Sequence, residues 1–189
     1  MVRRLVTSAI LLMGACTLLT GCMPTMTIDQ MKASMPERPA ELDRLETFLG
    51  EWTHEGEAKF AMLEEPIKTS GTSEAKWGGN RWYTVGHMTF NMEHFGESEG
   101  VECWTYDMHS KKYRSTWVDS MGMSGTGVGT FDEKTDTWHM TATSHGPWGK
   151  STMKGQFRFT DPNTMEWTWS ERQGLMKVME MKGTSKRVR

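Results

Sequence analysis

Histidine and aspartate are among the residue types in this chain that could carry acid–base or metal chemistry. The histidines do not follow the spacings of known metal-ligand motifs; they are His54, His87, His94, His109, His139 and His145. His54 follows Trp52 by two residues in an alternating segment, so both side chains are expected to face the same way. His54 is then either a buried neutral histidine hydrogen-bonded to a neighbour or a polar anchor at the bottom of a cavity.

Asp119 follows Trp117 by the same spacing. A carboxylate facing an aromatic interior is costly unless it is paired, which would mark a ligand contact or an ion pair with Arg81 or Arg172. The alternative is that Asp119 ends a strand and accepts hydrogen bonds from the turn that follows it. No nucleophile elbow, paired-carboxylate spacing or phosphate-binding glycine loop is present. An enzyme using Asp119 or His54 is therefore the weakest functional hypothesis, and no catalytic residue is predicted.

Two groups of methionines suggest copper(I), because thioether sulfur suits this soft ion. They are Met121 with Met123, and Met176 with Met179 and Met181. Met179 and Met181 occupy successive inward places on an expected strand, however, where methionine commonly serves as adaptable core packing. We therefore predict neither a metal nor a cofactor.

The elements that must position these residues are mostly strands. Ten segments alternate in polarity; they are 50–60, 67–77, 81–90, 99–106, 113–119, 125–131, 137–144, 150–160, 164–171 and 176–186. Turn residues separate them, and such short connections imply antiparallel neighbours. The segment from Pro39 to Leu49 has helical spacing and ends before Gly50. We expect an all-β antiparallel up-and-down barrel of about ten strands preceded by one short helix, with a two-sheet sandwich as the rival.

The interior of this barrel is expected to be aromatic and methionine-rich, because the chain has nine tryptophans and 18 methionines but few aliphatic residues. The alternation selects a set of lumen-facing candidates for ligand binding: His54, Trp82, Met88, Trp104, Trp117, Asp119, Trp138, Met140, Trp167 and Trp169. Such a lining is typical of barrels that bind a small apolar or amphipathic molecule. The alternative is a structural or interaction protein with a filled barrel and no ligand.

The N-terminus predicts export. Arg3 and Arg4 precede an apolar run from Leu5 to Leu19, which is typical of a secretory signal and too short to span a membrane. The net charge of the chain is −2 and becomes more negative without this signal, which argues against a nucleic-acid partner.

The end of the signal, Leu19-Thr20-Gly21-Cys22, resembles the lipobox of bacterial lipoproteins. The resemblance implies cleavage before Cys22 and acyl chains such as palmitate on that residue, which together anchor a protein to a membrane. Met23 in place of aspartate implies the outer membrane, with the protein facing the periplasm. The expected divisions are a signal peptide at 1–21, a lipidated tether without regular period at 22–38 and the barrel domain at 39–189. The alternative is an ordinary secretory signal with a chance cysteine.

A helix followed by Gly50-Glu51-Trp52 and a ladder of strands resembles the calycin superfamily, which includes lipocalins. The resemblance implies that Gly50 and Trp52 are structural and that Trp52 closes one end of the barrel. It also implies that a basic residue after the last strand, Arg187 or Arg189, packs on the Trp52 ring.

Three segments, 42–52, 104–120 and 129–132, resemble the family known as domain of unknown function 1579. This resemblance implies a calycin-like barrel and no assigned activity. Haem-binding barrels of the nitrobindin type are also similar in opening with Gly-x-Trp, but they use a histidine late in the chain. The last histidine here is His145, before the final two strands, so the resemblance does not extend to haem.

Overall fold

The computed structural model describes residues 25–188, so Cys22 and the expected signal peptide lie outside the described residues. The chain divides into two compact units, Met1–Glu37 and Arg38–Arg189. In the first unit an α-helix, α1 (Ile28–Ala33), lies within the segment expected to have no regular structure. Thr27 and Gln30 form a capping box, each side chain accepting the other's backbone N–H. A helix of six residues is too short for a hydrophobic period to reveal it.

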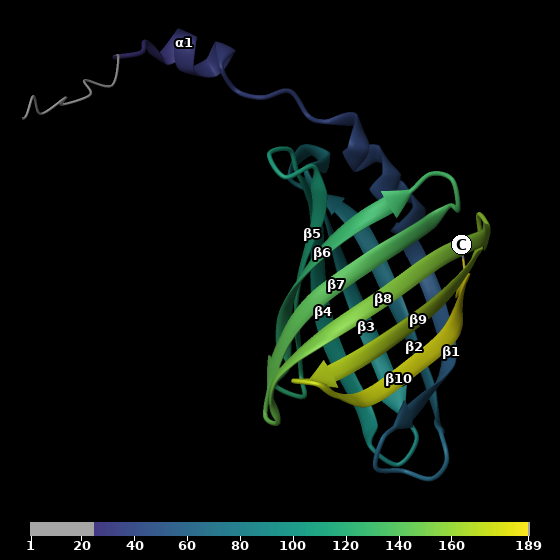
Figure 1. The fold of residues 1–189 in the computed structure, drawn as a ribbon. Coiled ribbons are helices and arrows are strands. Elements are labelled where there is room, and N and C mark those ends of the chain that lie inside the picture. The colour runs from purple at the N-terminus through teal and green to yellow at the C-terminus, as the bar shows by residue number, and fades with distance from the viewer. Residues whose placement is uncertain (1–24, 189) are drawn as a thin grey trace, which may run out of the picture. The chain divides into compact units, whose positions relative to one another are not determined.

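The second unit is a closed antiparallel barrel of ten strands (Figure 1). The strands are β1 (Gly50–Phe60), β2 (Ile67–Gly78), β3 (Tyr83–Met92), β4 (Gly96–Asp107), β5 (Lys112–Asp119), β6 (Ser124–Asp132), β7 (Thr137–Gly146), β8 (Gly149–Asp161), β9 (Thr164–Gln173) and β10 (Met176–Arg187). Each strand pairs with its sequence neighbours, and β10 pairs back onto β1. The predicted up-and-down barrel is confirmed, and the sandwich is excluded because every strand has two partners.

One end of the barrel is closed by a 3-10 helix, η1 (Ala40–Phe48), in the segment where a helix was expected. Leu42 and Leu45 are three residues apart, so they lie on the same side of a 3-10 helix, and both are fully buried. They pack against Tyr113 and Trp138 inside the barrel. A short 3-10 turn, η2 (Gly79–Arg81), delays the start of β3 by two residues relative to the prediction.

Aromatic rings fill the space beneath η1. The Phe48 ring centroid lies 5.0 Å from that of Trp138, 5.7 Å from that of Trp104 and 5.5 Å from that of Phe159. The Phe48–Trp104 pair is stacked and the other two are edge-to-face, and both kinds of contact add to the free energy gained by burying the rings. We call this cluster the aromatic plug; its members are Leu42, Leu45, Phe48, Trp52, Trp104, Tyr113, Trp138, Phe157 and Phe159.

Arg187 holds the plug to the end of the last strand. Its guanidinium carbon lies 4.2 Å from the Trp52 ring centroid, a cation–π geometry. The same guanidinium donates hydrogen bonds to the carbonyls of Leu49, Thr47 and, at 3.3 Å, Pro162. The Trp52 Nε1–H donates to the Phe48 carbonyl at 3.1 Å. Gly50 has a φ of 98°, a left-handed conformation that glycine adopts without strain where the chain turns from η1 into β1.

Candidate ligand-binding lumen

Inward-facing residues differ in exposure between the plug and the rest of the lumen. Trp138 in the plug is 0% exposed. Several inward-facing residues farther from η1 keep accessible surface although strands surround them; they are His54, Met88, Glu102, Trp117, Trp169, Glu171 and Met181. Because the sheet closes on itself, that surface faces the lumen. We call this region the open lumen.

Three tryptophan rings lie along the barrel wall over glycines of the neighbouring strand. The pairs are Trp117 with Gly125, Trp167 with Gly183 and Trp169 with Gly155, each joined in the strand register. A Cβ added at these glycines would lie 2.2, 2.4 and 2.6 Å, respectively, from the ring. The missing side chains therefore let large rings lie against the wall.

His54 lies one inward place beyond Trp52 on β1, directly above the plug. Its Nδ1 is 2.7 Å from Ser185 Oγ, and its Nε2 is 2.9 Å from Ser73 Oγ. Burial lowers the pKa of His54 to about 4, so the ring is neutral at physiological pH, with one nitrogen donating and the other accepting. Both ring nitrogens are used within the protein, which matches the structural alternative for this residue and not a free anchor.

Glu102 lies one inward place beyond Trp104 on β4, again on the lumen side of the plug. Its register partners are Gly86 on β3 and Trp117 on β5. Its carboxyl makes no hydrogen bond or ion pair with any residue in the described range 25–188, and burial raises its pKa to about 7. Glu102 was not among the residues selected from the sequence. Because Glu102 precedes Trp104 by two residues on the same strand, alternation places both side chains on the inward face.

Two other carboxylates, Asp119 and Glu171, also face the lumen. Asp119 ends β5, and its Oδ1 accepts hydrogen bonds from the N–H groups of Met121 and Met123 at 2.9 and 3.0 Å. This is the turn-stabilising alternative considered for Asp119. Glu171 on β9 faces inward beside Met153 and Met179. Among the described strand residues, the inward positions carry no lysine, and their one arginine is Arg187 in the plug.

The predicted ligand-lining residues fall into two groups. Trp82, Trp104 and Trp138 pack together with η1, and Met140 and Trp167 are almost covered. The remaining predicted residues face the open lumen with accessible surface: His54, Met88, Trp117, Asp119 and Trp169. Strand alternation predicts the face of a residue, but it does not predict the depth at which η1 fills the barrel.

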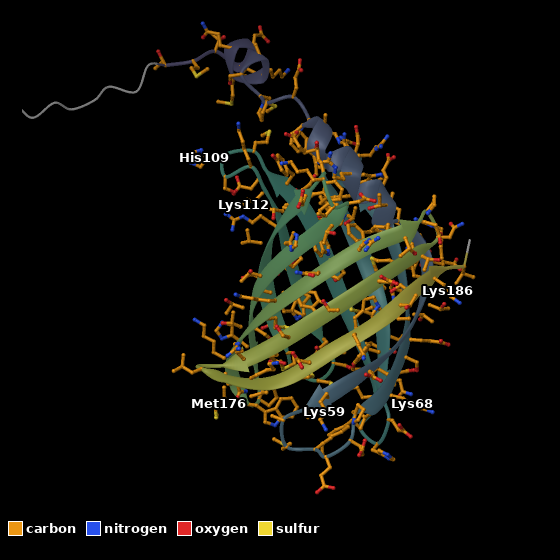
Figure 2. The ribbon with its side chains drawn as sticks, turned by 45° about the vertical axis from the view of Figure 1, so that its right-hand side comes forward. Lys59, Lys68, His109, Lys112, Met176 and Lys186 are labelled. Carbon is orange, nitrogen blue, oxygen red and sulfur yellow. The ribbon has the colours of Figure 1, made fainter. Side chains whose placement is uncertain are left out.

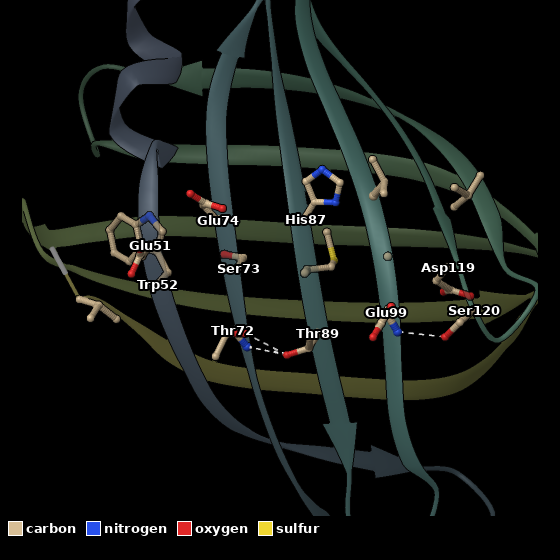
Figure 3. Close-up of a pocket in the computed structure, with 15 residues that line it drawn as sticks. Glu51, Trp52, Thr72, Ser73, Glu74, His87, Thr89, Glu99, Asp119 and Ser120 are labelled. Atoms are coloured by element: carbon tan, nitrogen blue, oxygen red, sulfur yellow. Dashed lines mark hydrogen bonds between the residues drawn. The ribbon is translucent and has the colours of Figure 1, made fainter.

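Two grooves on the barrel wall offer an alternative site. One has a volume of about 660 Å³ and crosses β1 to β5 (Figure 3), and the other has a volume of about 720 Å³ and crosses β7 to β10 and β1. Outward-facing side chains form most of both linings, for example Thr72 and Thr89, whose hydroxyls are 3.0 Å apart. A largely polar outer wall offers less apolar contact than the open lumen, which we therefore favour.

Large apolar side chains surround the mouth opposite η1. Met62, Phe95, Trp148 and Leu175 lie in or beside four hairpin loops and are between 59% and 94% exposed. Alternate loops of an up-and-down barrel share an end, so all four lie at this mouth. Figure 2 shows Lys59, Lys68 and Met176 at this end and His109 and Lys112 at the other. We call these four side chains the apolar rim; they place apolar surface on the loops of this mouth.

The described residues form neither a metal-binding cluster nor a membrane-spanning helix. Within residues 25–188, no three histidine, cysteine, aspartate or glutamate side chains are grouped so that they could hold a metal ion. No helix in that range is long and apolar enough to cross a membrane. Cys103 faces outward from β4 as a half-buried free thiol.

Comparison with known proteins supports the fold and names the family. The structure is similar to that of Rv2717c from M. tuberculosis, with a TM-score of 0.62, 13% identity and coverage of 81% of this chain and 100% of that one. It is also similar to the S-type phycobiliprotein lyase CPES from Guillardia theta, with a TM-score of 0.59, 8% identity and coverage of 87% and 99%. No curated protein sequence matches this chain. The family model described as "Protein of unknown function (DUF1579)" matches residues 37–185, so the chain belongs to that family.

Proposed function

We propose that this protein binds a small amphipathic molecule in the open lumen while lipid on Cys22 holds it at the outer membrane, facing the periplasm. The observation that carries the binding proposal is the accessible surface of inward-facing residues in a closed barrel. Trp117, Trp169 and Met181 offer apolar walls there, and the plug forms a floor. A mostly apolar cavity with a few polar groups is the usual form of a small-molecule site.

The apolar rim supports the same proposal. A ligand with a long apolar part must leave a membrane or carrier before it reaches the lumen. Exposed side chains such as Phe95 and Leu175 lower the free energy of that passage by covering apolar surface at the mouth. The alternative of a filled structural barrel is less favoured, because it would bury the inward-facing residues throughout.

Membrane anchoring rests on the lipobox resemblance at Cys22. Two or more acyl chains on one residue hold a protein firmly at a bilayer, whereas one chain binds only marginally. The anchor would keep the barrel beside the bilayer from which an amphipathic ligand can be drawn.

Two matched substitutions on β3 test the site. Gly86 faces the lumen, and a Cβ added there would meet nothing nearer than the Ala75 Cβ at 3.8 Å, so Gly86→Leu would project its side chain into the lumen without a backbone clash at the Cβ. His87→Leu places the same side chain on the outer wall, in the groove of Figure 3. Each protein would be purified from the membranes of its source and examined by native mass spectrometry.

We expect a stoichiometric small molecule with the wild type and with His87→Leu, and none with Gly86→Leu. Loss in His87→Leu alone would move the site to the outer groove. An empty wild-type protein whose tryptophan fluorescence ignores a panel of lipids, haem and copper would favour the structural alternative.

A further inference from the structure

Glu102 has no partner within the described protein. Its side chain faces the lumen with some accessible surface, and a carboxylate that has lost part of its hydration is costly unless an opposite charge or hydrogen-bond donors compensate it. Its neighbours in the register, Gly86 and Trp117, offer no side-chain donor within reach of a strong hydrogen bond. His54 also faces the lumen, but its ring is already bonded to Ser73 and Ser185.

The space beside Glu102 suits a ligand group. Gly86 adds no side chain there, and a Cβ at this position would make only ordinary contacts of 3.8–3.9 Å, so this glycine is not required for close packing. Trp117 stands on the other side of Glu102 with its ring against the wall over Gly125. A carboxylate next to an exposed aromatic face is the arrangement that recognises ammonium groups, through charge pairing and cation–π attraction.

The charges of the open lumen have one sign. Glu102 and Glu171 face it, Asp119 stands at its edge with one oxygen used by a turn, and His54 is neutral. No lysine or arginine among the described residues faces this region, since Arg187 is bound in the plug. An anionic headgroup would therefore meet repulsion without a compensating cation.

We infer that the ligand of the open lumen carries a cationic amine or quaternary ammonium on an otherwise apolar body, and that this cation pairs with Glu102 beside the Trp117 ring. The inference rests on the proposed function, because it names the chemistry of the same site. Fatty acids and other anionic amphiphiles are then poor ligands, although the barrel resembles folds that hold apolar molecules.

Three amphiphiles with the same alkyl chain test this inference: dodecyltrimethylammonium, dodecanol and laurate. Each is titrated below its critical micelle concentration into the purified protein at pH 8, where Glu102 is ionised, and tryptophan fluorescence and calorimetry give the Kd. We expect the ammonium compound to bind at least about tenfold more tightly than laurate, as pairing with a desolvated charge and an aromatic face implies.

Glu102→Gln should remove this preference and leave dodecanol binding unchanged, which also shows that the variant keeps its lumen. Glu97→Gln is the matched control, since Glu97 lies on the same strand but points outward. If Glu102→Gln kept the preference, or Glu97→Gln lost it equally, the assignment to Glu102 would be wrong. If the wild type bound all three compounds equally, the inference would fail while lumen binding stood. If it bound none, the proposed function itself would fail.

Discussion

At the scale of single residues, two side chains of the open lumen have pKa values shifted in opposite directions, so their contributions to folding stability change with pH in opposite senses. Burial lowers the pKa of His54 to about 4 and raises that of Glu102 to about 7. The unfolded chain binds a proton at His54 below about pH 6.5, so the folded state loses stability as the pH falls from there towards 4. At Glu102 the unfolded chain releases its proton first, so the folded state loses stability as the pH rises from about 4.5 to 7.

Glu102→Gln should therefore stabilise the ligand-free protein at pH 8 and not at pH 4.5. The gain has an upper limit of about 3 kcal/mol, because each pKa unit corresponds to about 1.4 kcal/mol and lumen water reduces the effect. Urea denaturation of wild type and variant across this pH range measures it, and the contribution of His54 cancels in the difference. A pH-independent difference would show that Glu102 does not titrate as described.

The residues of the lumen and the plug differ in how much of their role the sequence alone could predict. His54 was recognisable because alternation placed it beside Trp52, and the two serines that satisfy it lie on other strands. Glu102 was overlooked because a glutamate among mixed residues gives no apolar signal, even at an inward position. The complete burial of Trp138 depends on η1, whose position over the barrel no local pattern encodes.

At the scale of elements, the strands were predictable because polarity alternates along them, whereas the role of their glycines was not. A glycine in a strand usually weakens it, yet Gly125 accommodates a ring of the neighbouring strand. Gly86 faces the same lumen without such a ring. The strand register determines whether a ring of the neighbouring strand lies over a glycine, and the register cannot be read directly from the sequence.

These two glycines should respond differently to alanine. Gly125→Ala places a Cβ 2.2 Å from the Trp117 ring and 2.6 Å from the Thr143 carbonyl oxygen, so we expect a loss of roughly 1–3 kcal/mol from overpacking. Gly86→Ala meets ordinary contacts and reduces the freedom of the unfolded chain, so it should be neutral or stabilising by about 0.4–1 kcal/mol. Thermal and urea unfolding compare them directly. Equal losses at both sites would show that strand conformation, not ring packing, sets the cost.

At the scale of the whole molecule, the barrel is closed at one end by contacts between distant parts of the chain. Trp52, η1 and the end of β10 meet at Arg187. Trp52→Ala should cost roughly 3–5 kcal/mol, the usual range for removing a buried aromatic ring. Arg187→Ala should cost less in that variant than in the wild type, because its cation–π partner is gone. Additive losses in a double-mutant cycle would show that the two residues act independently.

Lipid on Cys22, as proposed, would attach the whole molecule to a membrane. Cys22→Ser removes the thiol that would carry lipid, so the chain should no longer incorporate labelled palmitate. Phase separation in a cloud-point detergent should then move it from the detergent phase to the aqueous phase, because the acyl chains that partition into detergent would be missing. Cys103→Ser is the matched control, since that thiol lies on β4 and should leave partitioning unchanged. Retention of Cys22→Ser in the detergent phase would instead point to the apolar rim, with Phe95 and Leu175, as the membrane contact.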